Sequence, residues 1–238
     1  MKRFISTLLL LSVVLWSATQ AMAFKPAVLF DMGGKFDKSF NEGIWNGLEK
    51  FRKETGIKYR EFEVQQEAQR EQFLRKLAKR GSDPILAVGF GQASAVEKIA
   101  KEFPNTRFSI IDVNWLNAPN IQGIAFKEQE GSFLVGVLAA MKSETGKVGF
   151  VGGMDIPLIH KFACGYVQGV KYINSGATVY QKMTGTTPAA WSDPARGAQL
   201  AKTMFDSGAD IVYAAAGSTG LGVLQAAADN GKFSIGVD

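Results

Sequence analysis

The sequence has one cysteine and one histidine among its 238 residues. Cys164 has no second cysteine with which to form an internal disulfide, and a zinc site of the cysteine–histidine kind needs more such ligands than the chain has. His160 lies four residues before Cys164 on a predicted helix, so the two side chains could share a face. A Cys–His nucleophile would also need direct contact and an oxyanion hole, and a helical cysteine beside Ala163 and Gly165 is more often a small packing residue. We therefore predict no catalytic residues, no metal site and no cofactor.

Glycine motifs that bind phosphate are also lacking. Gly33-Gly34-Lys35 has neither the spacing nor the following hydroxyl residue of a P-loop. The GSTGLG turn at 217–222 has the wrong spacing for the dinucleotide fingerprint. Its backbone N–H groups could still donate to a ligand oxygen at the start of a helix, although a tight strand-to-helix turn explains each glycine singly.

Long apolar runs are confined to the first residues of the chain. Lys2 and Arg3 precede an apolar run at 4–16, and a small-residue cleavage site follows at 21–23. These features predict a cleavable signal peptide over residues 1–23, and the run is short for a membrane span. No cysteine follows the cleavage site, so we expect a protein that is free in the periplasm rather than anchored by a lipid.

The charge balance gives little support for nucleic-acid binding. The formal net charge of the whole chain is +5, and two of its basic residues, Lys2 and Arg3, leave with the signal peptide. The remaining basic residues are dispersed rather than interleaved with aromatic residues. We expect a small-molecule ligand and no nucleic-acid partner.

From residue 24 onward, short apolar strands alternate with amphipathic helices, which is typical of doubly wound α/β folds. The predicted strands are 27–30, 58–64, 84–89, 107–113, 121–126, 147–151, 177–183, 211–216 and 233–237. The predicted helices are 41–54, 66–79, 93–102, 128–141, 157–173, 193–205 and 221–228. A crossover at 125–128 divides the chain into an N-terminal lobe, 24–126, and a second lobe, 127–238. Because the last strand ends at Asp238, we expect a C-terminal return segment to be missing.

Three predicted strands end in an aspartate, namely Asp31, Asp112 and Asp238. One such residue is usually a helix cap or a turn former. Three at equivalent places would face one crevice at the carboxyl ends of the strands, where open α/β sheets bind ligands. Carboxylates there can accept hydrogen bonds from vicinal hydroxyls or ring N–H groups. Paired-carboxylate glycoside hydrolysis stays open as an alternative.

Two aromatic residues lie in loops near this crevice. Phe40 and Asn41 follow the first strand and a Gly-Gly loop, in the run VLFDMGGKFDKSFN, which offers a ring, an amide and a carboxylate. The alternative is that Asp37 or Ser39 only caps the helix and Phe40 packs inward. Trp191 precedes a helix and is either a stacking platform or a lid over a core.

Together these motifs resemble the basic membrane protein family, the substrate-binding proteins of ABC importers that include purine nucleoside receptors. The matching segments are Asp31 with 37–41, PLIHKF at 157–162 before Gly165, AAGSTGLG at 215–222, and IGVD at 235–238. The resemblance implies a type I periplasmic-binding-protein fold, with two doubly wound parallel-sheet lobes and a ligand cleft between them. The sequence departs from the family pattern at Trp191, where a phenylalanine is expected. It also departs in length, since family members run further and supply a ligand-contacting lysine.

The resemblance also implies roles for particular residues. Phe40 would stack on one face of a purine base with Trp191 opposite, Asp31 and Asn41 would bind near the base edge, Asp112 would be a polar contact, Gly217 would line the cleft, and Asp238 would hold the ribose hydroxyls. The implied protein is a monomer that delivers its ligand to an ABC permease in the inner membrane. The alternatives are an exported nucleoside or sugar hydrolase that uses Asp31 and Asp112, and a ligand-sensing domain for a membrane receptor.

Overall fold

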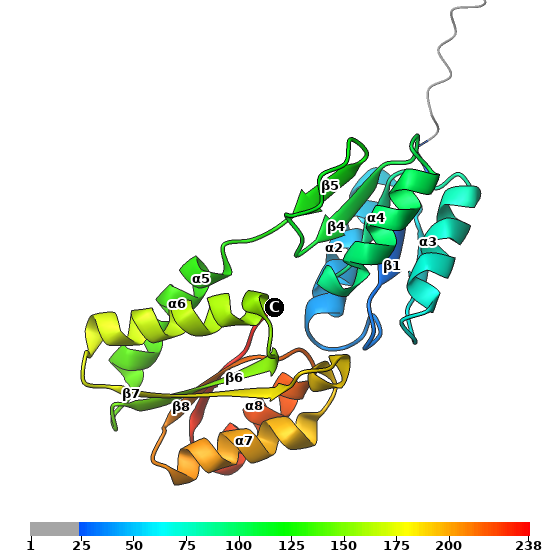
Figure 1. Ribbon diagram of the computed structural model, residues 1–238. Coiled ribbons are helices and arrows are strands. Elements are labelled where there is room, and N and C mark those ends of the chain that lie inside the picture. Colours follow the sequence, from blue (N-terminus) through cyan, green and yellow to red (C-terminus); the bar gives the residue numbers. More distant parts are fainter. Residues whose placement is uncertain (1–23) are drawn as a thin grey trace, which may run out of the picture.

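The computed structural model of the protein describes residues 24–238, and the predicted signal peptide lies outside the described residues. The described chain forms two separate parallel β-sheets, each with its own helices. Figure 1 shows the two resulting lobes, joined by the segment that leads from the first sheet into helix α5. The C-terminus lies between them.

The first lobe is a five-stranded sheet with the strand order β2-β1-β3-β4-β5. Its strands are β1 (Ala27–Phe30), β2 (Arg60–Glu63), β3 (Ile85–Ala87), β4 (Phe108–Ile111) and β5 (Ile121–Ile124). Its helices are α2 (Phe40–Thr55), α3 (Gln69–Lys79), α4 (Ala93–Glu102) and a short 3-10 helix at Phe90–Gln92. All four strand pairs are parallel, with Ala27 opposite both Arg60 and Ile85.

The second lobe is a four-stranded sheet with the strand order β7-β6-β8-β9. Its strands are β6 (Lys147–Met154), β7 (Thr178–Gly185), β8 (Ile211–Ala215) and β9 (Phe233–Ile235). Its helices are α5 (Glu128–Lys142), α6 (Pro157–Ile173), α7 (Pro194–Asp206), α8 (Thr219–Asp229) and a short 3-10 helix at Pro188–Trp191. Residues 125–127 connect β5 to α5.

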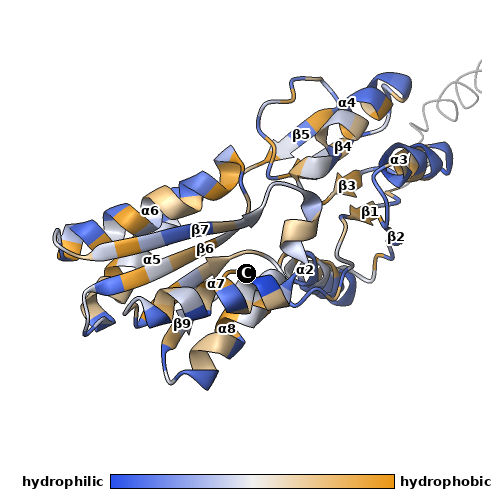
Figure 2. Ribbon diagram, turned by 60° about the horizontal axis from the view of Figure 1, so that its bottom comes forward, coloured by the Kyte–Doolittle hydropathy of each residue, from blue (hydrophilic) through white to orange (hydrophobic). Residues whose placement is uncertain are grey.

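Helices cover both faces of each sheet, which is why the central strands read as continuous apolar runs. In the first lobe α3 and α4 pack on one face and α2 on the other; in the second, α5 and α6 oppose α7 and α8. The side chains of β1 at Val28, Leu29 and Phe30 are fully buried. In Figure 2 strands β1 and β3 are coloured as hydrophobic, whereas α3 is mostly hydrophilic because much of its surface faces solvent.

The strand orders place a switch point in each sheet. The chain runs from β1 outward to β2 and then returns to β3 on the other side of β1, and it repeats this pattern from β6 to β7 and β8. Loops leaving adjacent strands therefore diverge to opposite faces and open a crevice at the carboxyl ends. The residues after β1 and β3 meet those after β6 and β8 at this crevice.

Helices α5 and α6 pack at a distance that only glycine permits. A Cβ at Gly136 would lie 2.2 Å from the Tyr166 backbone oxygen, and one at Gly169 would lie 2.0 Å from the Phe133 oxygen. Gly136 therefore serves close packing of the two helices. Gly131, in the same helix, has nothing within 4 Å of its Cβ position.

Element bounds differ from the predictions where tertiary contacts decide them. Gly152-Gly153, predicted as a loop, belongs to β6, because β6 is the strand between β7 and β8 and its pairing continues past Gly152. Helix α8 begins at Thr219 rather than at Leu221. Strand β2 and helix α3 begin later than predicted, at Arg60 and Gln69, and the 3-10 helix that ends at Trp191 was not predicted.

Candidate functional site

A cleft lies between the lobes at the carboxyl ends of both sheets, and residues of both lobes line it. All seven predicted site residues line it: Asp31, Phe40, Asn41, Asp112, Trp191, Gly217 and Asp238. The other lining residues are Met32, Gly33, Asp37, Gly89, Phe90, Leu158, Ile159, Phe162, Ser192, Ala215, Ser218 and Val237. The structure thus brings the predicted residues together, while their contact with ligand stays a prediction.

The start of α2 forms one wall of the cleft. The Asp37 carboxylate accepts hydrogen bonds from the backbone N–H groups of Ser39 (2.9 Å) and Asn41 (3.1 Å), which satisfies the free N–H groups of the helix start. Asp37 therefore caps the helix, as that alternative states, but it also lines the cleft. Phe40 combines both alternatives, because it packs against the core cluster around Phe30 and also lines the cleft.

Asn41 is 2% exposed, and its side-chain oxygen Oδ1 has no hydrogen-bond partner. Its Nδ2 donates a long hydrogen bond of 3.5 Å to the Asp31 backbone oxygen. A buried carbonyl oxygen without a donor is costly, about 1–3 kcal/mol. Since Asn41 lines the cleft, a ligand N–H or hydroxyl group would satisfy it.

Asp31 is held by an arginine that the sequence analysis missed. Arg70, on the first turn of α3, donates from Nη2 to Asp31 Oδ1 at 3.1 Å. The Arg70 side chain is 12% exposed and that of Asp31 is 20% exposed. The sequence carried no signal for this pair, because the predicted helix began at residue 66, and Arg70 looked like the other basic residues of that helix.

Trp191 forms the opposite wall, on a loop fixed by hydrogen bonds. The hydroxyls of Thr184 and Thr219 donate to the Ala190 backbone oxygen at 2.9 and 2.8 Å, and the Ser218 hydroxyl donates to that of Trp191 at 2.9 Å. The indole ring lies on Gly153, where a Cβ would be 2.1 Å from the ring. Trp191 therefore both lines the cleft and packs against the core of the second lobe.

Gly217 follows β8 in the left-handed region, with φ of 57°. A side chain there would be strained, and a Cβ would lie 3.2 Å from the Trp191 backbone oxygen. The glycine therefore allows the turn after β8 to pass close to the tryptophan loop.

Asp112 and Asp238 form the end of the cleft next to the connecting segment. Burial raises the pKa of Asp112 to about 6, and the negative charges of Glu128 and Asp238 add to the rise while Lys161 opposes it. Burial also raises the pKa of Asp238, against the hydrogen bond from Ser39. That bond, 2.6 Å from Ser39 Oγ to Asp238 Oδ2, joins the first lobe to the second.

The lining of the cleft is acidic and aromatic. It contains four aspartates and no lysine, arginine or histidine among the described residues. Its rings are Phe40, Phe90, Phe162 and Trp191. Such walls suit a ring-bearing ligand with hydrogen-bond donors and disfavour an anion, because burying an uncompensated negative charge beside carboxylates is costly.

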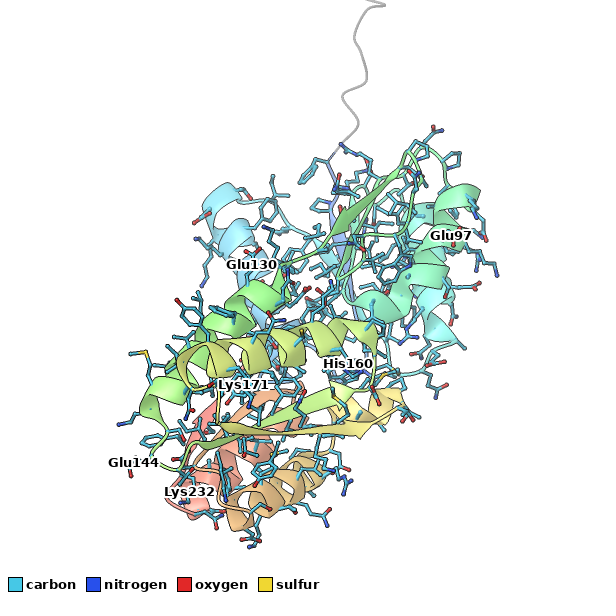
Figure 3. The ribbon with its side chains drawn as sticks, turned by 60° about the vertical axis from the view of Figure 1, so that its left-hand side comes forward. Glu97, Glu130, Glu144, His160, Lys171 and Lys232 are labelled. Carbon is cyan, nitrogen blue, oxygen red and sulfur yellow. The ribbon has the colours of Figure 1, made fainter. Side chains whose placement is uncertain are left out.

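The lone histidine and cysteine do not form a catalytic pair. His160 Nε2 lies 2.7 Å from Asp155 Oδ1, at the end of α6 nearest the first lobe (Figure 3). Cys164 Sγ instead accepts a hydrogen bond from Gln168 at 3.1 Å. The prediction that Cys164 packs inside was wrong, because its helix position points to solvent. Across residues 24–238 no cluster of three or more His, Cys, Asp or Glu residues could hold a metal ion.

Comparison with known proteins identifies the family to which the chain belongs. The model of the family described as "ABC transporter substrate-binding protein PnrA-like" matches residues 24–238. The chain belongs to this family. It is the basic membrane protein family whose motifs the sequence resembles, so that prediction is confirmed. Within residues 24–238, no helix has the length and apolar character that a membrane crossing requires.

Two curated relatives show how much of the family's length the chain covers. It is 34% identical over 209 residues to the CD4+ T-cell-stimulating antigen of Listeria monocytogenes, covering 86% of this chain and 57% of that protein. It is 33% identical over 207 residues to the ABC transporter nucleoside-binding protein BmpA of Lactococcus lactis, covering 85% of this chain and 58% of that protein. The chain therefore spans less than two thirds of the length of these relatives.

Among solved structures, an ABC transporter solute-binding protein of Aeropyrum pernix superposes with a TM-score of 0.81 at 31% identity, covering 89% of this chain and 61% of that one. The predicted fold class, two parallel-sheet lobes of the type I periplasmic-binding-protein kind, is confirmed. The family and this structural neighbour are substrate-binding proteins rather than enzymes.

Proposed function

We propose that this protein is the periplasmic ligand-binding component of an ABC importer and that its cleft binds a purine nucleoside. The observation that carries the proposal is the pair of aromatic side chains, Phe40 and Trp191, that line one cleft from opposite lobes. A flat base stacked on either ring gains about 1–3 kcal/mol. The relative from Lactococcus lactis is itself described as nucleoside-binding.

We assign the polar residues of the cleft to two groups, one that contacts the base of the ligand and one that contacts its sugar. Asp31 and the unpartnered Oδ1 of Asn41 offer acceptors next to Phe40, where the edge of a stacked base would lie. Asp112 and Asp238 form the second group: they are close enough for the charge of one to raise the pKa of the other, and two carboxylates can accept hydrogen bonds from ribose hydroxyls. Gly217 leaves room for the ligand between these groups.

Binding would couple to closure of the lobes. Residues 125–127 connect the two lobes, and residues of both lobes line the cleft, so the contacts of a bound ligand would be complete only when the lobes are together. A change of this kind is hinge closure. The closed form would present surfaces of both lobes to the permease, which is how the ligand state reaches the membrane.

The acidic lining also defines what the cleft excludes. Because no basic side chain of the described residues lines it, a phosphate group has no cationic partner there. We therefore expect the cleft to prefer nucleosides over nucleoside monophosphates.

The test is isothermal titration of residues 24–238 with adenosine, guanosine, inosine, ribose and inosine monophosphate, together with thermal unfolding. A nucleoside that binds only the folded state must raise the unfolding midpoint with its concentration. We expect binding of at least one nucleoside, none of ribose, and much weaker binding of the monophosphate. Recovery of the intact nucleoside after incubation separates binding from hydrolysis. A folded protein that binds no nucleoside would refute the proposal.

Single substitutions then test the aromatic walls. Phe40→Ala and Trp191→Ala should each weaken nucleoside binding by about 1–3 kcal/mol. Phe36→Ala is the matched control, because Phe36 is in the same loop but is 58% exposed and does not line the cleft. Unchanged affinity in both cleft variants would exclude stacking.

A further inference from the structure

We propose that Arg70 is a positioning residue of the cleft, which holds the Asp31 carboxylate so that its second oxygen accepts a hydrogen bond from a ring N–H of the bound base. The inference rests on the proposed function, since it assigns the specificity of the same cleft. It predicts that the protein selects bases that carry an N–H group on the edge facing Asp31.

The first argument is the geometry of the ion pair. Arg70 Nη2 donates to Asp31 Oδ1 at 3.1 Å, whereas its Nη1 lies 3.7 Å from the exposed Glu67 carboxylate. The buried Nε has no hydrogen-bond partner. Asp31 is therefore the close partner of a guanidinium that is mostly removed from water, so the two side chains are tied to one another.

The second argument is that the surrounding backbone leaves space for this pair. A Cβ at Gly91 would lie 2.9 Å from Arg70 Nη2 and 3.2 Å from Asp31 Oδ2. A Cβ at position 91 would force the guanidinium to shift and would crowd the carboxylate. The glycine of the short 3-10 helix after β3 thus allows a contact between α3 and the end of β1.

The third argument concerns the oxygen that remains. One point, the Cβ position of Gly89, lies 3.0 Å from Asp31 Oδ2 and 3.5 Å from Phe40 Cε1. Oδ2 is therefore next to the ring on which a base would stack. Within residues 24–238, the hydrogen bond to the Asp31 carboxylate is the one from Arg70 to Oδ1. Oδ2 is left as an acceptor at the cleft.

A carboxylate paired in this way accepts hydrogen bonds but does not donate them. The base edge at Asp31 must then supply the donor, as the N1–H group of hypoxanthine and guanine does. A base with a methyl group on N1 has no donor there and also occupies the space of the hydrogen bond. Inosine and 1-methylinosine therefore form a probe pair that differs at this contact.

The test is to titrate both nucleosides into the unmodified chain, Arg70→Met and Arg75→Met, and to compare the ratio of the two dissociation constants. Arg75 is the control, because it lies on the same helix but does not line the cleft. Its Nη2 donates to Glu102 Oε1 at 2.7 Å. Loss of a hydrogen bond to a charged group weakens binding by about tenfold to a hundredfold. We expect the unmodified chain and Arg75→Met to prefer inosine by such a factor, and Arg70→Met to lose most of the preference.

The ratio separates positioning from a structural role. General damage to the lobe by Arg70→Met would weaken both nucleosides equally and leave the ratio unchanged, which would overturn the proposal. If Arg70→Met does not fold, Arg70→Lys is the second variant; it keeps the charge without the planar fork, and an undiminished ratio there would also overturn the proposal. If the unmodified chain binds inosine and 1-methylinosine with equal affinity, the role of Arg70 is refuted but the proposed function is not. Failure to bind any nucleoside refutes the proposed function with it.

Discussion

Asp112 is the residue whose charge should limit the stability of the folded protein. Its pKa is about 6 against an ordinary value of 3.8, mainly because of burial. A difference of this size corresponds to about 3 kcal/mol between the protonated and ionised forms. Because folding raises this pKa, the proton bound to Asp112 stabilises the folded state. This stabilisation is fully present below pH 3.8 and is lost as the pH rises through 6. Above pH 7 the ionised side chain lowers the free energy of unfolding by the whole amount.

Asp112→Asn removes this charge without a change in backbone preference. Asp112 has φ of 64°, in the left-handed region that asparagine tolerates well. We expect the variant to be more stable than the unmodified chain by up to about 3 kcal/mol at pH 8, and by about half of that at pH 5, where the folded carboxyl is already mostly protonated. For a protein of this size the gain at pH 8 corresponds to about 6–12 °C in the unfolding midpoint.

The measurement is urea unfolding of both proteins without ligand at pH 8 and pH 5. Asp83→Asn is the control of opposite sign, since hydrogen bonds from Arg107 lower the pKa of that carboxyl. It should destabilise the protein equally at both pH values, because its contribution is lost only as the pH falls below 3.8. An Asp112→Asn effect that is the same at pH 8 and pH 5, or a loss of stability at pH 8, would refute the reasoning.

Three further predictions address packing and the contact between the lobes. Gly136→Ala places a Cβ within 2.2 Å of the α6 backbone and should lower the free energy of unfolding in urea by about 1–3 kcal/mol. Gly131→Ala is the control; it has open space around it and should be neutral or stabilising. Equal effects of the two substitutions would contradict the close contact of α5 with α6. Gly153→Ala pushes against the Trp191 ring and should weaken nucleoside binding about tenfold by calorimetry, so unchanged binding would show that the ring position is unimportant. Ser39→Ala removes the 2.6 Å hydrogen bond between the lobes and should increase the radius of gyration of the ligand-free protein in small-angle scattering; an unchanged radius would argue against its role in closure.

The local pattern of the sequence was enough to predict most elements and the place of the site. Strands such as β1 and β8 are buried on both faces, so their apolar runs are unbroken and bounded by glycine or charge. Asp31 and Asp112 could be placed at the cleft because the carboxyl ends of parallel strands share one edge of a sheet. The family motifs then predicted which other residues would join them.

The contacts that hold the site together could not be predicted in the same way. Ser39 and Asp238 are 199 residues apart, and nothing local marks them as partners. Arg70 meets Asp31 only because α3 starts at Gln69 and Gly91 leaves space beside it. Gly153 looked like a loop residue because glycine is rare within strands, but here its missing side chain accommodates a tryptophan ring.

The glycine contacts between α5 and α6 have a mechanical consequence. Helix α5 begins directly after 125–127, and it packs so closely against α6 that the two helices would move together. The first turns of α6 carry Leu158, Ile159 and Phe162, which line the cleft. A small change of backbone torsion in 125–127 would therefore move both helices and, with them, this wall of the cleft. In the proposed binding cycle, the movement that opens the lobes would also withdraw these side chains from the ligand.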